Sequence, residues 1–335
     1  MVFHPVRPAE VAHPLTRFFP PPRFLAHSAV YNPRTMSKLV PLHDAIRDLV
    51  HDGDLIYAAG FTHLIPFAAG HEIIRQGRRH LTLARATPDL LYEQMVAAGC
   101  ADKVIFSYSG NPGVGSLHLV RAEMEAGRLA YEEYTHFAMI TRLTAGAAGL
   151  PFLPMLPVGT DDLAHANPHY RTVADPYSGA LLNTVPALRP DVAIVHAQRA
   201  DANGNTQIWG IVGEQKEAAF AARRVIVSAE EIVDESVVRS DPNRTLIPAL
   251  IVSAVCHVPH AAHPSYTQGY YDRDNAFYLE WDRLSTEPAR VRAWLDEWVF
   301  AVPGRAEYWD KLGAPVHARL AVRPRWSEPV NYGEC

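Results

Sequence analysis

Apolar and polar residues alternate with two different periods in the chain after residue 40. Over 40–52 the apolar residues recur at the spacing of one helix face, and the segment ends at Gly53. The apolar run DLIYAAG at 54–60 predicts a strand, and helical spacing returns over 66–76. This order of strand, turn and helix is the unit from which parallel sheets are built.

The same unit recurs further along the chain. Strands are predicted at 80–86, 104–109, 191–198 and 224–233, and helices at 88–99, 116–126, 290–300 and 305–312. The last two strands are almost continuously apolar, as expected where helices cover both faces of a sheet. The pattern therefore predicts an α/β fold with an open, largely parallel sheet flanked by helices, as one large domain over residues 36–335.

Residues 1–35 do not share this pattern. They contain seven prolines and show no helical or strand periodicity, which indicates a flexible extension. Their four arginines against one acid leave a transit peptide as the alternative, but the segment has no apolar stretch and too many prolines for one. Met36 is then the expected start of the working protein, and mass spectrometry of the native N-terminus tests this.

Composition narrows the class of function. The net charge of -5 is spread along the chain without a basic stripe, so we expect no nucleic-acid partner. The cysteines Cys100, Cys256 and Cys335 stand far apart, which predicts neither a disulfide framework nor a zinc knuckle and fits a cytoplasmic protein. The sequence has no run of eighteen apolar residues, so we expect no membrane span.

Many short segments together carry a family resemblance. In chain order they are MSKLVPLHDAI from 36, GDLIYAAGF at 53–61, GHEIIRQG at 70–77, FSYSGNPGVGS at 106–116, EEYTHF at 132–137, GLPFLP at 149–154, DVAIVHAQ at 191–198 with the DANGN turn after it, IWG at 208–210, EEIV at 230–233, IPALIVSAVCHVPHAAHPS at 247–265, YYDRDN at 270–275 and EWVF at 297–300. As an ordered set they resemble the A subunits of family I CoA transferases, glutaconate CoA-transferase in particular. The resemblance runs from residue 36 to the end of the chain.

This resemblance implies an enzyme that is active only with a B-type subunit. In such a hetero-oligomer the B subunit supplies a glutamate that attacks an acyl-CoA thioester, and coenzyme A passes to a second carboxylic acid through covalent intermediates. Coenzyme A is then a substrate, and no permanently bound cofactor is expected. Two alternatives stay open: one chain of a hydrolase that cleaves a CoA thioester or a CoA-linked ring, and a non-enzymatic acyl-CoA-binding protein.

The turn at 109–116 is the strongest local signal for a site. Its glycines stand between a predicted strand and a helix N-terminus, where backbone N–H groups can approach an anion or an oxyanion; they also suit a plain tight turn. The turn lacks the lysine of a phosphate-binding Walker loop and the spacing of a dinucleotide-binding loop. With the resemblance, we expect the turn to contribute Ser109, Gly110, Asn111, Gly113, Val114, Gly115 and Ser116 to binding of acyl-CoA.

Four further residues extend this expected site. Gly60, Phe61 and Thr62 follow a strand at the edge where open α/β sheets bind ligands, and the resemblance places them in the crevice. Thr87 ends the next strand, and the nearby Asp89 is placed to cap the following helix.

His136 is the one candidate for a catalytic role in this chain. The resemblance places a polar residue at this position near the acyl group, where a histidine could donate a hydrogen bond; the alternative is a partly exposed histidine at a helix start. The neighbouring Glu132 and Glu133 point to opposite faces of a strand, so we expect a solvated strand end there.

Two histidine- and acid-rich runs are not expected to bind metal. His257, His260 and His263 are spaced i, i+3, i+6 and flanked by prolines, which spreads them too widely for one zinc ion. The run Asp272–Asn275 lacks the glycine and the glutamate of a calcium loop and predicts a turn held by its own side chains.

Overall fold

The structure is a computed structural model that describes residues 37–156 and 161–322. The helices are α1 (Leu42–Leu49), α2 (Phe67–Arg75), α3 (Leu90–Ala97), α4 (His118–Glu125), α5 (His136–Ala147), α6 (Asp161–Ala166), α7 (Gln215–Ala221), α8 (Glu235–Ser240), α9 (Asn275–Leu284), α10 (Pro288–Leu295), α11 (Arg305–Leu312) and α12 (Ala314–Leu320). The strands are β1 (Leu55–Ala58), β2 (Leu81–Ala84), β3 (Ala101–Phe106), β4 (Ala130–Glu133), β5 (Phe152–Met155), β6 (Arg171–Ala174), β7 (Leu181–Pro186), β8 (Val192–Asp201), β9 (Thr206–Gln207), β10 (Arg224–Val233), β11 (Thr245–Ile247) and β12 (Ala254–His257).

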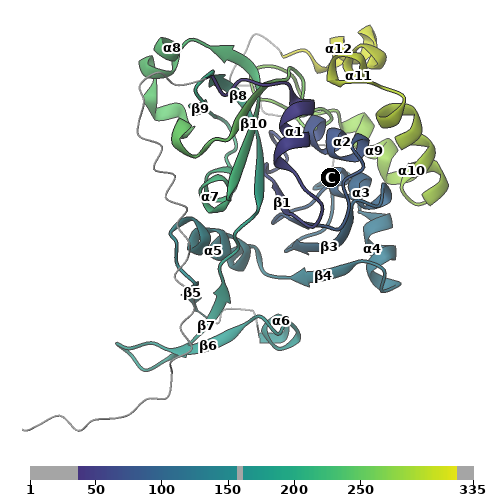
Figure 1. Cartoon of the computed structure of the whole chain (residues 1–335). Coiled ribbons are helices and arrows are strands. Elements are labelled where there is room, and N and C mark those ends of the chain that lie inside the picture. The colour runs from purple at the N-terminus through teal and green to yellow at the C-terminus, as the bar shows by residue number, and fades with distance from the viewer. Residues whose placement is uncertain (1–36, 157–160, 323–335) are drawn as a thin grey trace, which may run out of the picture. The chain divides into compact units, whose positions relative to one another are not determined.

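The main sheet is parallel over most of its width (Figure 1). Strands β12, β10, β8, β1, β2, β3 and β4 lie side by side in that order, and each adjacent pair is parallel. Strands β9 and β11 extend the sheet in antiparallel pairing from the end of β8. The strand order reverses between β1 and β8, and such a reversal is where open α/β sheets form a ligand crevice at the carboxyl ends of their strands.

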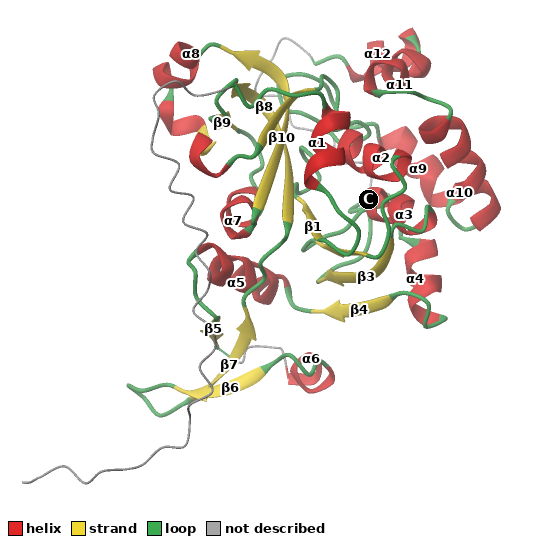
Figure 2. Ribbon diagram, in the orientation of Figure 1, coloured by secondary structure: helices red, strands yellow, loops and turns green. Residues whose placement is uncertain are grey.

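Alternate residues of each central strand enter two separate hydrophobic cores. In β1, Ile56 packs into one core and Tyr57 into the other, as the two-residue period of a strand requires. Helices α1, α2, α3, α4, α9 and α10 contribute to the first core, and α5 and α7 to the second. Figure 2 shows the helices on both sides of the strands. The expected parallel sheet with helices on both faces is confirmed.

A second, three-stranded sheet was not predicted. Strands β5, β7 and β6 pair antiparallel in that order and lie away from the main sheet in Figure 1. All four residues of β6 are exposed, and β5 has one buried residue. Neither strand therefore shows the apolar alternation from which a half-buried strand is recognised.

Two expectations concern parts of the chain at the limits of this description. The proline-rich extension expected over residues 1–35 lies outside the described residues. Within the described ranges, none of the helices is both long and apolar enough to cross a membrane.

Candidate functional site

The expected site residues lie on loops at one edge of the main sheet. Gly60, Phe61 and Thr62 follow β1, Thr87 follows β2, the 109–116 turn follows β3, and His136 follows β4. Because β1 to β4 are parallel, these four loops leave the sheet at the same edge. The fold thus brings together residues that are up to 76 positions apart, from Gly60 to His136.

The loop after β1 is held in an unusual backbone conformation. Gly60 has φ 139°, and a Cβ atom there would lie 2.8 Å from the carbonyl oxygen of His63. Thr62 and Leu64 have φ 55° and 58°, a region that residues with a side chain seldom adopt. Ser265 donates its hydroxyl to the Thr62 carbonyl at 2.7 Å, and the Leu64 N–H donates to the Tyr266 carbonyl at 3.0 Å. Such strain persists where surrounding structure fixes it, often at ligand sites.

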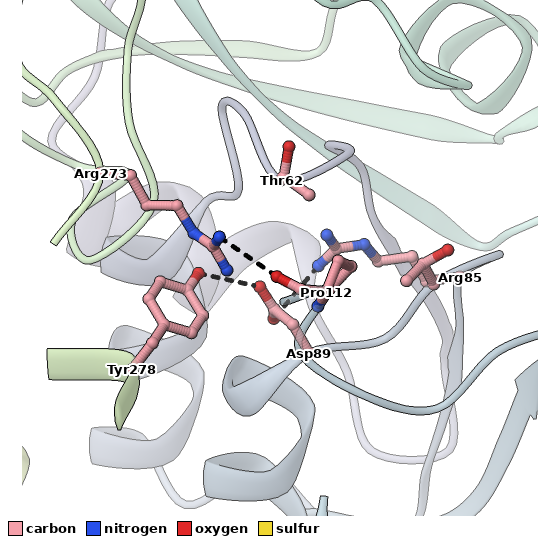
Figure 3. Close-up of a pocket in the computed structure, with 7 residues that line it drawn as sticks. Thr62, Arg85, Asp89, Pro112, Arg273 and Tyr278 are labelled. Carbon is pink, nitrogen blue, oxygen red and sulfur yellow. Dashed lines mark hydrogen bonds and ion pairs between the residues drawn. The ribbon is translucent and has the colours of Figure 1, made fainter. Parts of the chain in front are cut away.

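A pocket opens between this loop, the end of β2 and helix α9 (Figure 3). Its walls are Thr62, Arg85, Thr87, Asp89, Pro112, Arg273 and Tyr278. Thr62 and Thr87 were expected at the site, and Pro112 lies inside the expected turn. The pocket is lined by charged residues that are almost completely buried. Arg85, Asp89 and Arg273 are exposed by only 1%, 3% and 4%.

Asp89 ties the polar groups of the pocket together. Its side chain accepts the Leu91 N–H at 3.1 Å and so caps α3, as expected from the sequence. Arg85 Nη1 lies 3.3 Å from Asp89 Oδ1, and the Tyr278 hydroxyl lies 3.3 Å from Oδ2. Burial, and then the neighbouring Asp89 charge, raise the pKa of Tyr278, so its hydroxyl stays protonated and donates to Asp89.

His136 is exposed at the start of α5, with both ring nitrogens hydrogen-bonded. Nδ1 lies 2.8 Å from Ser107 Oγ, and Nε2 lies 2.8 Å from Thr87 Oγ1. Ser107 donates its own proton to the Ala86 carbonyl at 2.5 Å, so Nδ1 must be the N–H that donates to Ser107. In the neutral ring Nε2 then accepts from Thr87. A bond from Nε2 to a substrate requires a protonated ring and displacement of Thr87.

The 109–116 turn is fastened to its surroundings mainly by Asn111. Its side chain accepts the Leu90 N–H at 3.0 Å, so it supports the N-terminus of α3 beside Asp89. Its backbone pairs with Gly115, and Val114 is buried. Gly113 and Gly115 are exposed, with φ 76° and 128°. The turn therefore closes on itself and presents its glycines at the surface.

Amides at the end of this turn and in the first turn of α4 already donate to carboxylates of the protein. Ser116 N–H donates to Asp282 Oδ1 at 2.9 Å, and Leu119 N–H donates to Glu93 Oε1 at 2.7 Å. A Cβ atom at Gly115 would lie 2.3 Å from Asp282 Oδ1, so this glycine permits α9 to approach. These two N–H groups would have to give up their present acceptors to bind a phosphate or an oxyanion.

The expectation for Glu132 was wrong. Its side chain is only 11% exposed and lies 2.5 Å from Lys103 Nζ and 3.4 Å from Arg142 Nη1. The strand end is therefore an ion-pair cluster and not a solvated end. The cations come from β3 and α5, so the local sequence gives no sign of them. Glu133 is exposed, as expected.

The histidines of the string have different partners, and one of them pairs with the acidic run. His260 stacks on Trp309 with ring centroids 3.9 Å apart, whereas His263 is buried between Tyr308 and Asp274. Asp274 caps α9 and also pairs with Arg319 at 2.8 Å, a contact from outside the local turn. In the part of the chain that the structure describes, no three His, Cys, Asp or Glu side chains are placed to hold a metal ion.

Three pocket residues were missed from the sequence: Arg85, Arg273 and Tyr278. Arg85 did carry a signal, because a cation at the end of the apolar strand LTLA has to be buried beside a partner. Arg273 and Tyr278 gave no comparable signal. They reach the pocket from the segment around the start of α9, about 190 residues after Arg85 (Figure 3).

The sequence and the fold both match known proteins. The sequence model of the family described as coenzyme A transferase matches residues 41–257. The chain is 46% identical over 280 residues to the A subunit of 3-oxoadipate CoA-transferase from Pseudomonas knackmussii, covering 83% of this chain and 99% of that protein. It is 34% identical over 307 residues to the A subunit of glutaconate CoA-transferase from Acidaminococcus fermentans, covering 86% and 96%. The crystal structure of glutaconate coenzyme A-transferase from that organism matches with a TM-score of 0.81 at 35% identity, over 86% of this chain and 96% of the other.

Proposed function

This chain belongs to the coenzyme A transferase family as an A subunit, and from that premise we propose that it moves coenzyme A between an acyl-CoA and a carboxylic acid together with a B-type subunit. The catalytic glutamate in this proposal is on the B subunit. The A subunit supplies the pocket at the ends of β1 and β2. We place the reaction in the cytoplasm, where the buried free thiols Cys100 and Cys256 stay reduced.

The observation that carries the proposal is the state of the one carboxylate in the pocket. A family I reaction needs a carboxylate that is free to attack a thioester. Asp89 is the single acid among the seven lining residues, and it is committed to the α3 cap, Arg85 and Tyr278. An acid with these partners is a poor nucleophile, and this observation supports a division of labour in which the B subunit supplies the glutamate.

The proposed reaction proceeds by two exchanges at the glutamate of the B subunit. Its carboxylate attacks the thioester carbonyl, and the C–S bond breaks. CoA leaves as a thiolate, and the acyl group remains on the glutamate as an acyl-glutamyl anhydride. The thiolate then attacks the glutamyl carbonyl, which releases the first acid as a carboxylate and leaves a glutamyl-CoA thioester. The second acid repeats these steps in reverse and leaves as its CoA ester.

For the A subunit we propose a binding role for the strand-end loops. These are Gly60, Phe61, Thr62, Thr87 and the turn residues Ser109, Gly110, Asn111, Gly113, Val114, Gly115 and Ser116. Thr62 and Thr87 line the pocket directly. The Phe61 ring meets the His136 ring edge-on at 6.5 Å between centroids, so both belong to the rim of the same site.

His136 is our candidate for polarising the thioester. When protonated, its Nε2 can turn from Thr87 to the carbonyl oxygen, while Nδ1 stays anchored on Ser107. His136→Gln keeps a donor, and His136→Phe removes it. We expect His136→Phe to lower kcat by about 100- to 1,000-fold more than His136→Gln, since one oxyanion donor is worth about that much.

Dicarboxylic acids are the first substrates to test. The relatives at 46% and 34% identity are named for 3-oxoadipate and glutaconate, which both carry two carboxyl groups. The test is co-expression with a B-type subunit, followed by exchange of CoA between acyl-CoA donors and these acids. After incubation with acyl-CoA, mass spectrometry should trap a glutamyl-CoA thioester on the B subunit.

Hydrolysis and simple binding are the competing outcomes. Release of free CoA at the same rate with and without an acceptor acid would indicate a hydrolase. Binding of acyl-CoA with no turnover would indicate a binding protein. Either result, with a folded complex, overturns the proposed transfer.

A further inference from the structure

Arg85 is buried beyond what its contacts explain. Its side chain is 1% exposed, and its polar contact inside the pocket is the 3.3 Å approach of Nη1 to Asp89. Charged hydrogen bonds of this type usually measure about 2.7–2.9 Å. Its Nε is fully buried without a hydrogen-bond partner among the described residues. A buried guanidinium in this state is costly unless an acceptor arrives.

A second polar atom is unsatisfied in the same pocket. Thr62 is 9% exposed, and its Oγ1 has no partner in the described part of the chain. The backbone of Thr62 is held at φ 55° by the Ser265 contact, so the hydroxyl is kept in place beside the pocket. Thr62 and Arg85 reach the pocket from the ends of β1 and β2.

The opposite wall of the pocket also carries a guanidinium. Figure 3 shows the Arg273 and Arg85 side chains directed from two sides toward Asp89 and Pro112. Arg273 Nη1 donates to the Pro112 carbonyl at 3.3 Å, and its guanidinium carbon lies 4.2 Å above the Tyr278 ring. The seven lining residues thus include two cations and one anion. A further buried acid, Glu214, is held by the Tyr57 hydroxyl at 2.8 Å and does not line the pocket.

An excess of buried donors and of positive charge among the lining residues fits a carboxylate. A carboxylate has two acceptor oxygens in a plane, which the fork of a guanidinium matches. Resting on the proposed function, we propose that Arg85 is the specificity-determining residue of the enzyme, and that it binds the carboxylate of a dicarboxylic substrate that does not react.

The reacting carboxylate is a poorer occupant. A carboxylate paired with a guanidinium is a weaker nucleophile, and the reacting group must also reach the glutamate of another subunit. The lining residues that the structure describes lie at the ends of β1 and β2, in the turn after β3 and around the start of α9. The carboxylate that does not react has neither disadvantage, because it only has to be bound. A phosphate of CoA offers similar charge, and the experiment has to separate the two.

The experiment uses the reconstituted complex of both subunits and two six-carbon acids, adipate and hexanoate. They differ in the second carboxylate alone. The variants are Arg85→Gln and Arg85→Lys, and the control is Arg290→Gln on the exposed face of α10. We measure kcat/KM for each acid as CoA acceptor, KM for the acyl-CoA donor, and the shift in melting temperature that each acid causes.

We expect Arg85→Gln to lower kcat/KM for adipate by about 100-fold or more, since the charged hydrogen bonds to one carboxylate are lost. The values for hexanoate, and KM for acyl-CoA, should stay within about threefold, and Arg85→Lys should lie between Arg85→Gln and the wild type. Adipate should raise the melting temperature of the wild-type complex and of Arg290→Gln but not that of Arg85→Gln.

Three results would overturn the inference. Equal losses for both acids would place Arg85 at the reacting carboxylate. A raised KM for acyl-CoA alone would assign the site to a phosphate of CoA. Unchanged kinetics in a folded variant would leave Arg85 with a structural role. If the wild-type complex transfers CoA to no acid, the proposed function fails first, and the adipate melting shift still tests the binding site. Should Arg85→Gln not fold, Arg85→Lys carries the comparison.

Discussion

Glu230 and Asp89 are two buried carboxylates with nearly equal exposure, 5% and 3%, but very different surroundings. Glu230 receives His196 Nε2 at 2.7 Å, the Tyr271 hydroxyl at 2.8 Å and the His260 N–H at 2.7 Å. Asp89 has its two side-chain donors, Arg85 and Tyr278, at 3.3 Å. We call the Glu230 cluster closed, because its hydrogen bonds are short. We call the Asp89 cluster open, because its side-chain contacts are long.

The difference separates a structural network from a binding site. Burial alone would raise the pKa of Glu230, but the hydrogen bond and charge of His196 lower it below its usual value. Its surroundings therefore stabilise the charge completely. Around Asp89, long contacts and unpartnered atoms at Arg85 and Thr62 leave capacity for a ligand. Burial of charge by itself does not identify a site, whereas unsatisfied buried donors that also line a pocket indicate one.

Breaking the closed cluster should have the largest effect on stability. Glu230→Gln leaves His196 buried without its carboxylate, and we expect a loss of about 3–5 kcal/mol in the free energy of unfolding. Urea unfolding of the variant and the wild type measures this. Glu231→Gln, one residue further along β10 with a side chain 45% exposed, is the matched control and should cost less than about 1 kcal/mol. Equal effects of the two changes would contradict the comparison.

A third buried carboxylate tests whether hydrogen bonds without a cation suffice. Glu93 accepts the Trp281 Nε1–H and the Leu119 N–H, each at 2.7 Å, yet burial raises its pKa to about 7. Because the pKa in the folded state lies above the unfolded value, stability should fall as the pH rises from about 4.5 to 7 and then level off. The loss from this group is about 3 kcal/mol.

Glu93→Gln should remove this part of the pH dependence. Between pH 4.5 and 8 the wild type should lose about 3 kcal/mol in free energy of unfolding relative to Glu93→Gln. The exposed Glu307→Gln is the control, and its profile should run parallel to that of the wild type. A constant difference for Glu93→Gln across this range would show that the carboxylate is already ionised at low pH.

Removing both charges of the open cluster should change the free energy of unfolding only slightly. In the double variant Arg85→Met with Asp89→Asn, the asparagine still caps α3, and the guanidinium with its long contact to Asp89 is gone. We expect a free energy of unfolding within about 1 kcal/mol of the wild type. A loss as large as that of Glu230→Gln would mean that this cluster holds the fold together.

Substitutions at Thr62 should have the smallest effect on the free energy of unfolding. Thr62→Gly relieves the left-handed backbone but adds flexibility to the unfolded chain, so a gain of about 0.5 kcal/mol is expected. Thr62→Ala keeps the backbone strain and removes the hydroxyl, and it should be neutral because Oγ1 has no partner among the described residues. Urea unfolding measures both. A loss of more than about 1 kcal/mol in Thr62→Ala would mean that the hydroxyl is already satisfied.

The fold was largely predictable because its strands are short apolar runs between helices. The segment 224–233 was assigned to a strand with the bounds that β10 has in the structure. The strand-end position of Thr62 and Thr87 followed from the rule that parallel strands end at one edge. In the antiparallel sheet of β5, β6 and β7, the mostly exposed strands β5 and β6 were missed because they lack an apolar period.

The composition of the pocket was less predictable. Asp89 was recognised as a helix cap, but its contact with Tyr278 joins residues 189 positions apart. Glu132 was predicted to be exposed to solvent. Its ion-pair partners Arg142 and Lys103 lie on other elements, so the local sequence did not reveal them. Local patterns indicate where a strand ends, whereas charge pairs across the fold depend on tertiary contacts that one sequence does not specify.

The anchoring of Thr62 by Ser265 has a consequence for the order in which the protein is made. The loop after β1 leaves the ribosome early, but the hydroxyl that holds it is 203 residues further along the chain. Arg273 and Tyr278 emerge later still. Because a domain generally folds as a unit, the pocket can form only after this last segment has been made. A chain that stops before residue 265 is therefore expected to have no capacity to recognise a substrate.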